Sequence, residues 1–180
     1  EPITPADKPT DKVKIIYASK PTNGLGLLYA VFTRLCSEFD NLELHVFADW
    51  AAWGAPDLMF GNEIIEKCKR HPKVVWHGAQ PNPVVREHMA SSHIYAYPSI
   101  FPEISCLPLI EAMSAKCICV HPKGGALDET AISKTFMYDA PDNHFQHSER
   151  FIKYLRSAIQ AVNSGDLSWF DLDGQKEAID

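Results

Sequence analysis

Two carboxylates, Glu103 and Glu111, lie eight positions apart and could bind the hydroxyl groups of one extended ligand. If a helix begins between them, its first backbone N–H groups have no partner inside the helix and form a site that phosphates favour. This combination fits a diphosphate with a polyol at each end, which describes a nucleotide sugar. The spacing alone fits equally well two solvated glutamates, because glutamate is common in helices.

The residues around the two glutamates predict a short strand, a loop and a helix. Residues 94–98 have the apolar character of a buried strand, which Pro98 and Pro102 bring to an end. Ser105 is a suitable N-cap, and Pro108 then falls in the first helical turn, where proline is tolerated. At about 1.5 Å per residue, the two carboxylates are expected up to about 12 Å apart. Helical spacing predicts one buried face, formed by Leu107, Ile110, Met113 and Ser114.

Composition restricts the possible classes of protein. The chain has 180 residues, 46% of them hydrophobic, which is enough for one domain with a full core. A net charge of -6 and a pI near 5.7 argue against nucleic acid or an anionic membrane as the main partner. Five cysteines without ligand-like spacing favour a reducing, cytoplasmic location. Neither a signal peptide nor an apolar run long enough for a membrane helix is predicted.

Strands and helices are expected to alternate along residues 13–163, between a linker at 1–12 and a solvated acidic segment at 164–180. The first helix begins near Leu25, with Leu28, Phe32, Leu35 and Phe39 on one face. The other helices are expected at 61–70, 83–91, from 105 and at 147–163. The strands are expected at 13–18, 42–48, 73–77, 94–98, 117–121 and, weakly, 135–138. Repeated βα units predict a Rossmann-like α/β fold with a doubly wound parallel sheet, which binds ligands at the carboxyl ends of its strands. The loops after residues 18, 78, 98 and 121 are therefore the candidate ligand-binding segments.

Four motifs in this order resemble the C-terminal, donor-binding half of a GT-B glycosyltransferase of the retaining family 4, also called group 1. The resemblance covers roughly residues 13–163. Glu103 and Glu111 frame the main motif, which continues as Ala-Met and a small residue. The other three are Ser19-Lys20 with Asn23-Gly24 after the first strand, Trp76-His77-Gly78 after the third, and Gly124-Gly125 with Glu129 after the fifth. The dinucleotide fingerprint and the Walker sequence are both absent.

The resemblance implies a role for each motif. Glu103 contacts the donor sugar and Glu111 the ribose, while Lys20 offsets the charge on the departing diphosphate. Glu103 and Lys20 are thus the catalytic candidates. The donor-binding candidates are Ser19, Asn23 and Gly24 in the first loop, Gly78, Ala79 and Gln80 beside the base, and Ile104, Ser105, Cys106 and Leu107, whose backbone meets the phosphates. No metal or other cofactor is expected, because the resemblance implies that the helix end and nearby cations replace a metal ion at the diphosphate.

The resemblance also implies partners for the chain. They are a nucleotide sugar, an acceptor that is a sugar, glycan, lipid or protein, and an N-terminal acceptor domain that this chain lacks. The isolated chain is expected to bind the donor but to transfer little. Asn23 stands where the family has a second basic residue, so the alternative is a non-catalytic nucleotide-sugar-binding or interaction module. A flavodoxin-like regulatory domain is a third, weaker hypothesis, since no acidic cluster or flavin loop follows the first strand.

Four further side chains allow two interpretations each. His77 and His121 follow strands, where a histidine is more often structural than functional. Trp50 and Trp53 fit either an exposed patch or ordinary loop packing.

Overall fold

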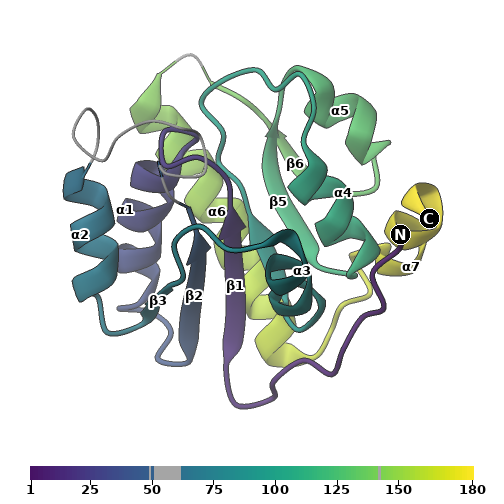
Figure 1. Cartoon of the computed structure of the whole chain (residues 1–180), viewed down its shortest axis with the longest axis horizontal. Helices are drawn as coiled ribbons and strands as arrows, with labels where there is room; N and C mark the ends of the chain where they lie inside the picture. The colour runs from purple at the N-terminus through teal and green to yellow at the C-terminus, as the bar shows by residue number, and fades with distance from the viewer. Residues whose placement is uncertain (49, 51–61, 142) are drawn as a thin grey trace.

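Six parallel strands form a single sheet in the computed structural model, which describes residues 1–48, 50, 62–141 and 143–180 (Figure 1). Their order is β3-β2-β1-β4-β5-β6, so the chain reverses its direction of winding between β1 and β4. The strands are β1 (Val13–Ala18), β2 (Leu42–Phe47), β3 (Val74–Trp76), β4 (Ile94–Ala96), β5 (Ile118–Lys123) and β6 (Phe136–Asp139). The predicted doubly wound parallel sheet is confirmed.

Helices cover both faces of the sheet. α1 (Leu25–Leu35) and α2 (Asn62–Arg70) contact each other, and α1 also contacts α6 (His144–Ser164), which crosses behind the sheet in Figure 1. α3 (Asn82–Ala90), α4 (Leu107–Ser114) and α5 (Ala126–Ala131) lie on the opposite face. In the described part of the chain, no helix combines the length and the apolar character needed to span a lipid bilayer.

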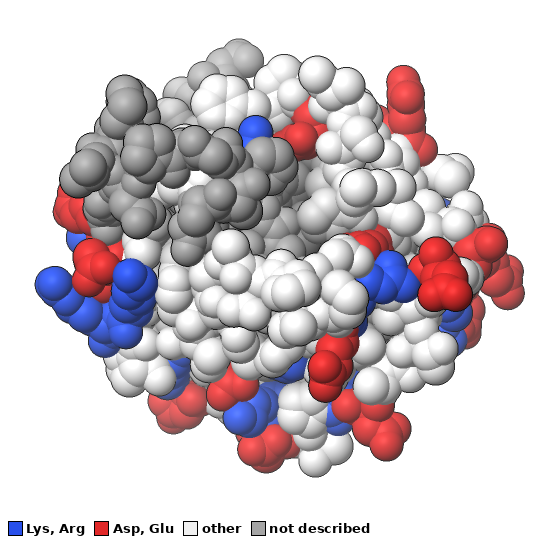
Figure 2. Space-filling view, in the orientation of Figure 1, with Lys and Arg blue, Asp and Glu red and all other residues white. Residues whose placement is uncertain are grey.

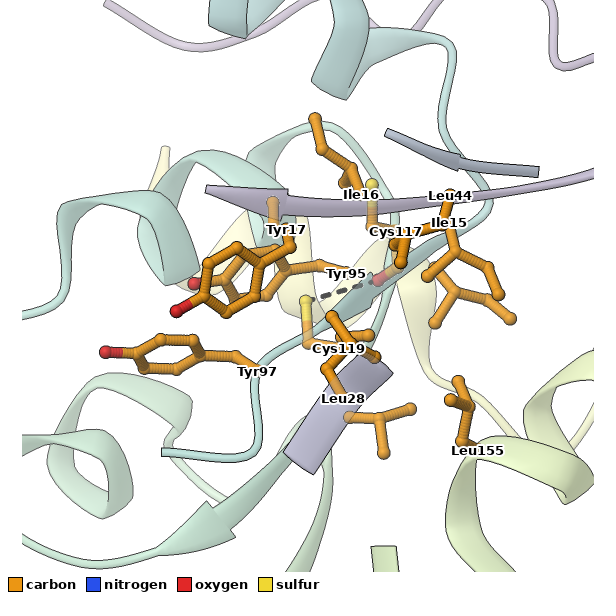
Figure 3. Packing of buried hydrophobic residues seen from close by; sticks show 14 of the residues in the cluster. Ile15, Ile16, Tyr17, Leu28, Leu44, Tyr95, Tyr97, Cys117, Cys119 and Leu155 are labelled. Carbon is orange, nitrogen blue, oxygen red and sulfur yellow. Dashed lines mark hydrogen bonds between the residues drawn. The ribbon is translucent and has the colours of Figure 1, made fainter. Parts of the chain in front are cut away.

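The core lies between these layers and is continuous along the central strands. All six residues of β1 are buried, as a strand covered by helices on both faces requires. Tyr17 lies on β1, Tyr95 on β4 and Tyr97 directly after β4, and all three pack beside aliphatic residues (Figure 3). Cys117 and Cys119 are fully buried there, and burial raises the pKa of both thiols. They therefore behave as small apolar residues.

Both terminal segments pack against α4. The backbone N–H of Ile3 donates to Ser114 Oγ over 2.7 Å, and Ser114 Oγ in turn donates to Asp180 Oδ1 over 2.7 Å. The acidic segment is mostly exposed, but it contains α7 (Leu172–Ile179), whose buried Gln175 donates to the carbonyl of Cys117 over 2.9 Å. This helix was not predicted, because the contacts that order it come from residues distant in the sequence. The expected linker likewise contributes Ile3 to the core.

Several element boundaries also differ from the sequence-based expectation. α1 ends at Leu35, so Phe39 packs on the core from the following turn. α6 begins at His144, because the side chain of Asn143 caps it by accepting from the backbone N–H of Gln146 over 2.9 Å. α5 was not predicted, since its six residues are too few for a helical period to be recognised.

Candidate functional site

The loops that follow β1 and β4 meet at the point where the winding direction reverses. Gly24, in the first of these loops, has a φ of 100°, and a Cβ atom there would lie 2.1 Å from the carbonyl oxygen of Pro98. Only glycine allows this close approach of the two backbones. The predicted first-loop motif and the glutamate motif are therefore brought together in space.

The carboxylate of Glu103 is held by two neighbouring side chains. Its Oε1 accepts a hydrogen bond from Asn23 Nδ2 over 3.0 Å and a short one from the hydroxyl of Tyr97. Asn23 Nδ2 also lies 3.1 Å from the Tyr97 hydroxyl and 3.4 Å from Ser19 Oγ. Ser19, Asn23 and Glu103 therefore form one polar network, as their predicted roles in a single site require. Tyr97 was not among the site residues predicted from the sequence.

Three buried tyrosines connect this network to the core. The rings of Tyr17, Tyr95 and Tyr97 lie close together, with centroids 6.1 Å apart for Tyr17 and Tyr97 and 5.7 Å apart for Tyr95 and Tyr97 (Figure 3). The Tyr17 hydroxyl donates to the carbonyl of Lys20 over 2.5 Å, and the Tyr95 hydroxyl lies 3.9 Å from Cys106 Sγ. Burial raises the pKa of all three tyrosines, so they stay neutral. Tyr17 thus contacts the first loop, while Tyr95 and Tyr97 contact the glutamate motif.

The backbone of Glu103 is fixed from the other side by the Gly-Gly turn after β5. Glu103 and Gly125 form a parallel bridge, and the carbonyl of Glu103 accepts from the N–H of Ala126 over 2.7 Å. Gly125 has a φ of 58°, and a Cβ atom there would lie 2.3 Å from the Glu103 oxygen. The glycine is needed because the two backbones touch at this point.

The N-cap of the helix between the two glutamates lies one residue later than predicted. It is Cys106, which makes no side-chain capping bond, whereas Ser105, the predicted cap, is exposed. The predicted buried face was also partly wrong, because Leu107 is 67% exposed and Leu109 takes its place in the core. The buried face of α4 is instead formed by Leu109, Ala112, Met113 and Ser114.

Backbone N–H groups are available at this helix start. Among the hydrogen bonds formed within the described residues, none is donated by the backbone N–H of Ile104, Ser105, Cys106 or Leu107. Such groups, at the positive end of a helix, attract an anion. In Figure 2 many of the charged side chains lie along the lower and lateral margins, and a few lie in the upper middle beside the grey residues. An anion bound at α4 would be held in part by these N–H groups.

Glu111 lies on α4 with its side chain 13% exposed. Its Oε1 accepts from Arg86 Nη1 over 3.0 Å and from Asn82 Nδ2 over 2.9 Å, both on α3. Neither partner was predicted from the sequence, since nothing in the local pattern of α3 indicates which helix it faces. One carboxylate oxygen of Glu111 is thus engaged by the protein.

A pocket of about 210 Å³ brings most of the remaining predicted residues together. Its walls include Ser19, Glu111 and the loop after β3, in which Gln80 Nε2 donates to the carbonyl of His77 over 2.8 Å. The residues that line it are Ala18, Ser19, Phe47, Ala48, Gly78, Ala79, Gln80, Asn82, Val85, Pro108 and Glu111. A larger hollow of about 540 Å³ beside α6 contains none of the predicted site residues. The smaller pocket is the better candidate because it lies at the carboxyl ends of the strands.

The remaining candidates from the sequence have different placements. Lys20 follows β1 and is half-buried, and its carbonyl also accepts from the N–H of Asn23 over 3.0 Å. His121 is buried, with hydrogen bonds to the carbonyl of Pro122 and to Thr135 Oγ1, so its structural interpretation holds. Trp50 is half-buried, and Trp53 lies outside the described residues.

Comparison with protein families gives one extended match. Residues 4–164 match the family described as Glycosyl transferases group 1, which is most of the chain. Comparison with curated proteins gives no match.

Solved structures with a similar fold include two bacterial glycosyltransferases. The C-terminal domain of LpcC, a glycosyl transferase group 1 family protein from Francisella tularensis, has a TM-score of 0.70 at 19% identity, over 99% of this chain and 97% of that one. A glycosyltransferase from Rickettsia africae has a TM-score of 0.72 at 17% identity, over 95% of this chain and 43% of that one.

A third similar structure carries a ligand. The pneumococcal O-GlcNAc transferase GtfA, in complex with UDP and GlcNAc, has a TM-score of 0.63 at 13% identity, over 99% of this chain and 36% of that one. The chain therefore spans less than half the length of the pneumococcal and Rickettsia proteins. At identities this low, the structural similarity shows only the fold, which is similar to that of the C-terminal domain of a GT-B enzyme.

Proposed function

The chain belongs to the group 1 glycosyl transferases, and we propose that it is the donor-binding half of a retaining enzyme that transfers a hexosyl group from a nucleotide diphosphate sugar. One observation carries the proposal. The unpaired N–H groups of residues 104–107 lie between two carboxylates, and the second of these shares a pocket with the loop after β3. This arrangement matches the order phosphate, ribose and base in such a donor.

Each part of the donor has a proposed partner. The diphosphate binds at the start of α4, where the N–H groups and Lys20 offset the charge that grows on it as it leaves. The sugar hydroxyls donate to Glu103, which Tyr97 and Asn23 hold in place. The ribose hydroxyls donate to the oxygen of Glu111 that Arg86 leaves unoccupied, and the base enters the 210 Å³ pocket beside Gly78 and Gln80.

The proposed reaction exchanges one bond at the anomeric carbon for another on the same face of the sugar. The bond from this carbon to the diphosphate oxygen breaks, and a bond to the acceptor oxygen forms. The proton of the acceptor hydroxyl passes to an oxygen of the departing phosphate, so no protein carboxylate has to accept it. In this proposal the helix end and Lys20 replace the metal that other transferases use to stabilise a leaving diphosphate.

Acceptor binding is assigned to a preceding domain, because the similar Rickettsia and pneumococcal proteins are more than twice as long as this chain. The proposed acceptor is a sugar, glycan, lipid or protein. A cytoplasmic location is part of the proposal, since all five cysteines are free thiols. The isolated chain should therefore bind a donor and transfer little.

Calorimetry on the full chain tests the donor site, with UDP, GDP and ADP used alone and as sugar conjugates. Glu111→Ala should weaken binding of plain nucleotide by about 10-fold or more, as loss of a hydrogen bond to a charged group does. Glu103→Ala should matter only when the sugar is attached. Glu87→Ala on the exposed side of α3 is the matched control and should change neither. Absence of binding by every nucleotide at millimolar concentration would overturn the proposal.

A second candidate function is a non-catalytic nucleotide-sugar-binding or interaction module. The observation that favours it is the position of Asn23, whose amide is used by Glu103 and Tyr97 inside the protein. A basic side chain at this position would instead reach toward a diphosphate. Joining the chain to an N-terminal half of a family member, with and without Asn23→Lys, separates the two candidates: turnover without the substitution supports the enzyme.

A further inference from the structure

Three histidines that the proposed donor site does not use come together beside β2. His45 lies on β2, His77 follows β3 and His88 lies on α3. One ring nitrogen from each lies within 4.8 Å of those of the other two, and His45 Nδ1 is 2.9 Å from His77 Nε2. Neutral imidazole is a common metal ligand, and two ligand nitrogens on one ion lie only slightly further apart.

On the side of its ring away from His77, His45 contacts a carboxylate, as many metal-binding histidines do. Its Nε2 lies 2.8 Å from Glu43 Oε1, and the other oxygen of Glu43 accepts from Lys12 Nζ over 2.9 Å. With the Nε2 proton donated to the carboxylate, Nδ1 of His45 carries a lone pair and accepts a hydrogen bond from His77 Nε2, and a metal ion would replace the shared proton. A carboxylate behind a ligating histidine fixes the tautomer and strengthens the ligand, and this pairing recurs in metal sites.

The surroundings hold the three rings in place. His77 stacks on Phe47 with ring centroids 4.2 Å apart and an interplanar angle of 2°. The centroids of His77 and His88 are 4.5 Å apart.

One charged group opposes a cation at this cluster. Lys14 Nζ lies 3.5 Å from His88 Nδ1 and donates to Ser91 Oγ over 2.6 Å. This leaves Nε2 of His88 as its ligand atom. The ammonium should weaken metal binding, and the carboxylate of Glu43 offsets this repulsion only in part because it also pairs with Lys12.

We propose that His45, His77 and His88 form a three-nitrogen site for a zinc ion or a related divalent transition metal, with a fourth position open to water. Nitrogen ligands and a half-buried position suit zinc better than magnesium or calcium, which prefer oxygen. The site lies directly before the loop of Gly78, Ala79 and Gln80. The proposal is independent of the donor site, and no step of the proposed transfer passes through this metal.

The test is a titration of the metal-free full chain with Zn²⁺ against a competing chelator, together with Co²⁺ absorption spectra. One equivalent should bind, and the cobalt spectrum should show the bands of a tetrahedral nitrogen site. His88→Ala, on the half-exposed face of α3, should weaken binding by at least about 10-fold. His144→Ala is the control, because His144 is exposed and outside the cluster, and it should bind like the unchanged chain.

Two further variants keep the proposal falsifiable if a histidine variant unfolds. Glu43→Gln should weaken zinc binding by about 10–100-fold, as loss of an outer carboxylate does, while Lys14→Met should tighten it. A sulfur-to-cobalt charge-transfer band would reveal cysteine ligands and overturn the proposal. Equal affinities for His88→Ala and His144→Ala in folded protein, checked by circular dichroism, would overturn it as well.

Discussion

The side-chain amide of Asn23 donates a hydrogen bond to the carboxylate of Glu103 over 3.0 Å. The first-loop motif and the glutamate motif, 80 positions apart, are therefore directly coupled. The residue at position 23 accordingly affects both the charge near the diphosphate and the orientation of the carboxylate that we assign to the sugar.

Asn23→Lys should strengthen binding of a nucleotide diphosphate. A charge-assisted contact contributes about 1.5 to 3 kcal/mol, so calorimetry should show affinity for UDP or its relatives rising by about 10-fold or more. Thr22→Lys, which adds the same charge at an exposed neighbouring position, should give a much smaller gain. If both lysines act equally, the effect is one of general charge and not of a contact at position 23.

Tyr97→Phe should weaken binding of the sugar conjugate and spare the plain nucleotide. The hydroxyl of Tyr97 donates to Glu103, and its removal leaves this carboxylate held by Asn23 alone. We expect a loss of about 5 to 10-fold, corresponding to about 1 to 1.5 kcal/mol. Tyr154→Phe on α6 is the control for removing a tyrosine hydroxyl outside the site. An equal loss with plain nucleotide would contradict the positioning role.

Two glycine substitutions should change stability in opposite directions. Gly125→Ala places a Cβ atom against the backbone of Glu103 at a positive φ, and should lower the free energy of unfolding by about 1 to 3 kcal/mol. Gly26→Ala, in α1 with open space around it, should raise that free energy by about 0.5 to 1 kcal/mol. Urea denaturation measures both. A neutral Gly125→Ala would show that the bridge between Glu103 and Gly125 does not constrain this turn.

Arg86 and Glu111 should contribute to stability as a coupled pair. Arg86 Nη1 lies 3.0 Å from Glu111 Oε1, and the two side chains are 25% and 13% exposed. Arg86→Met should therefore destabilise the chain by about 1 kcal/mol, and by less when Glu111 is already glutamine. A double-mutant cycle from urea denaturation gives the coupling energy. Additive effects of the two substitutions would mean that the ion pair adds no stability.

His93 should make stability depend on pH in the acidic range. Its Nδ1 accepts from the backbone N–H of Lys14 over 3.0 Å, and burial, followed by the charge of Lys8, lowers its pKa to about 4. In the unfolded chain the pKa of histidine is about 6.5, so the unfolded state takes up the proton first. The contribution to stability is therefore complete above pH 6.5 and is lost as the pH falls toward 4.

Urea denaturation between pH 7.5 and pH 4 measures this dependence. His93→Asn, which retains an acceptor without titrating in this range, should lower the slope by up to about 1.4 kcal/mol per pH unit. His144→Asn, at an exposed position, should leave the slope unchanged. Identical slopes for His93→Asn and the unchanged chain would show that His93 does not titrate differently on folding.

The sequence by itself determined the alternation of strands and helices and the order of the motif-bearing loops. These features depend on local patterns, such as the apolar run of β1, the helical spacing of Leu25, Leu28 and Phe32, and the prolines after β4. Periodicities of two and 3.6 residues can be read within one segment. The glutamate motif could be recognised from its residue types and from its place among the motif-bearing loops, without knowledge of the tertiary structure.

Only the tertiary structure decided which side chains meet at the site. Tyr97 reaches Glu103, Arg86 reaches Glu111 and His45 reaches His77 because strand order and helix rotation place them together. α7 is ordered in the same way, by Gln175 and its partner across 58 positions. Such contacts leave no periodic mark in the sequence, since each depends on how distant elements pack rather than on neighbouring residues.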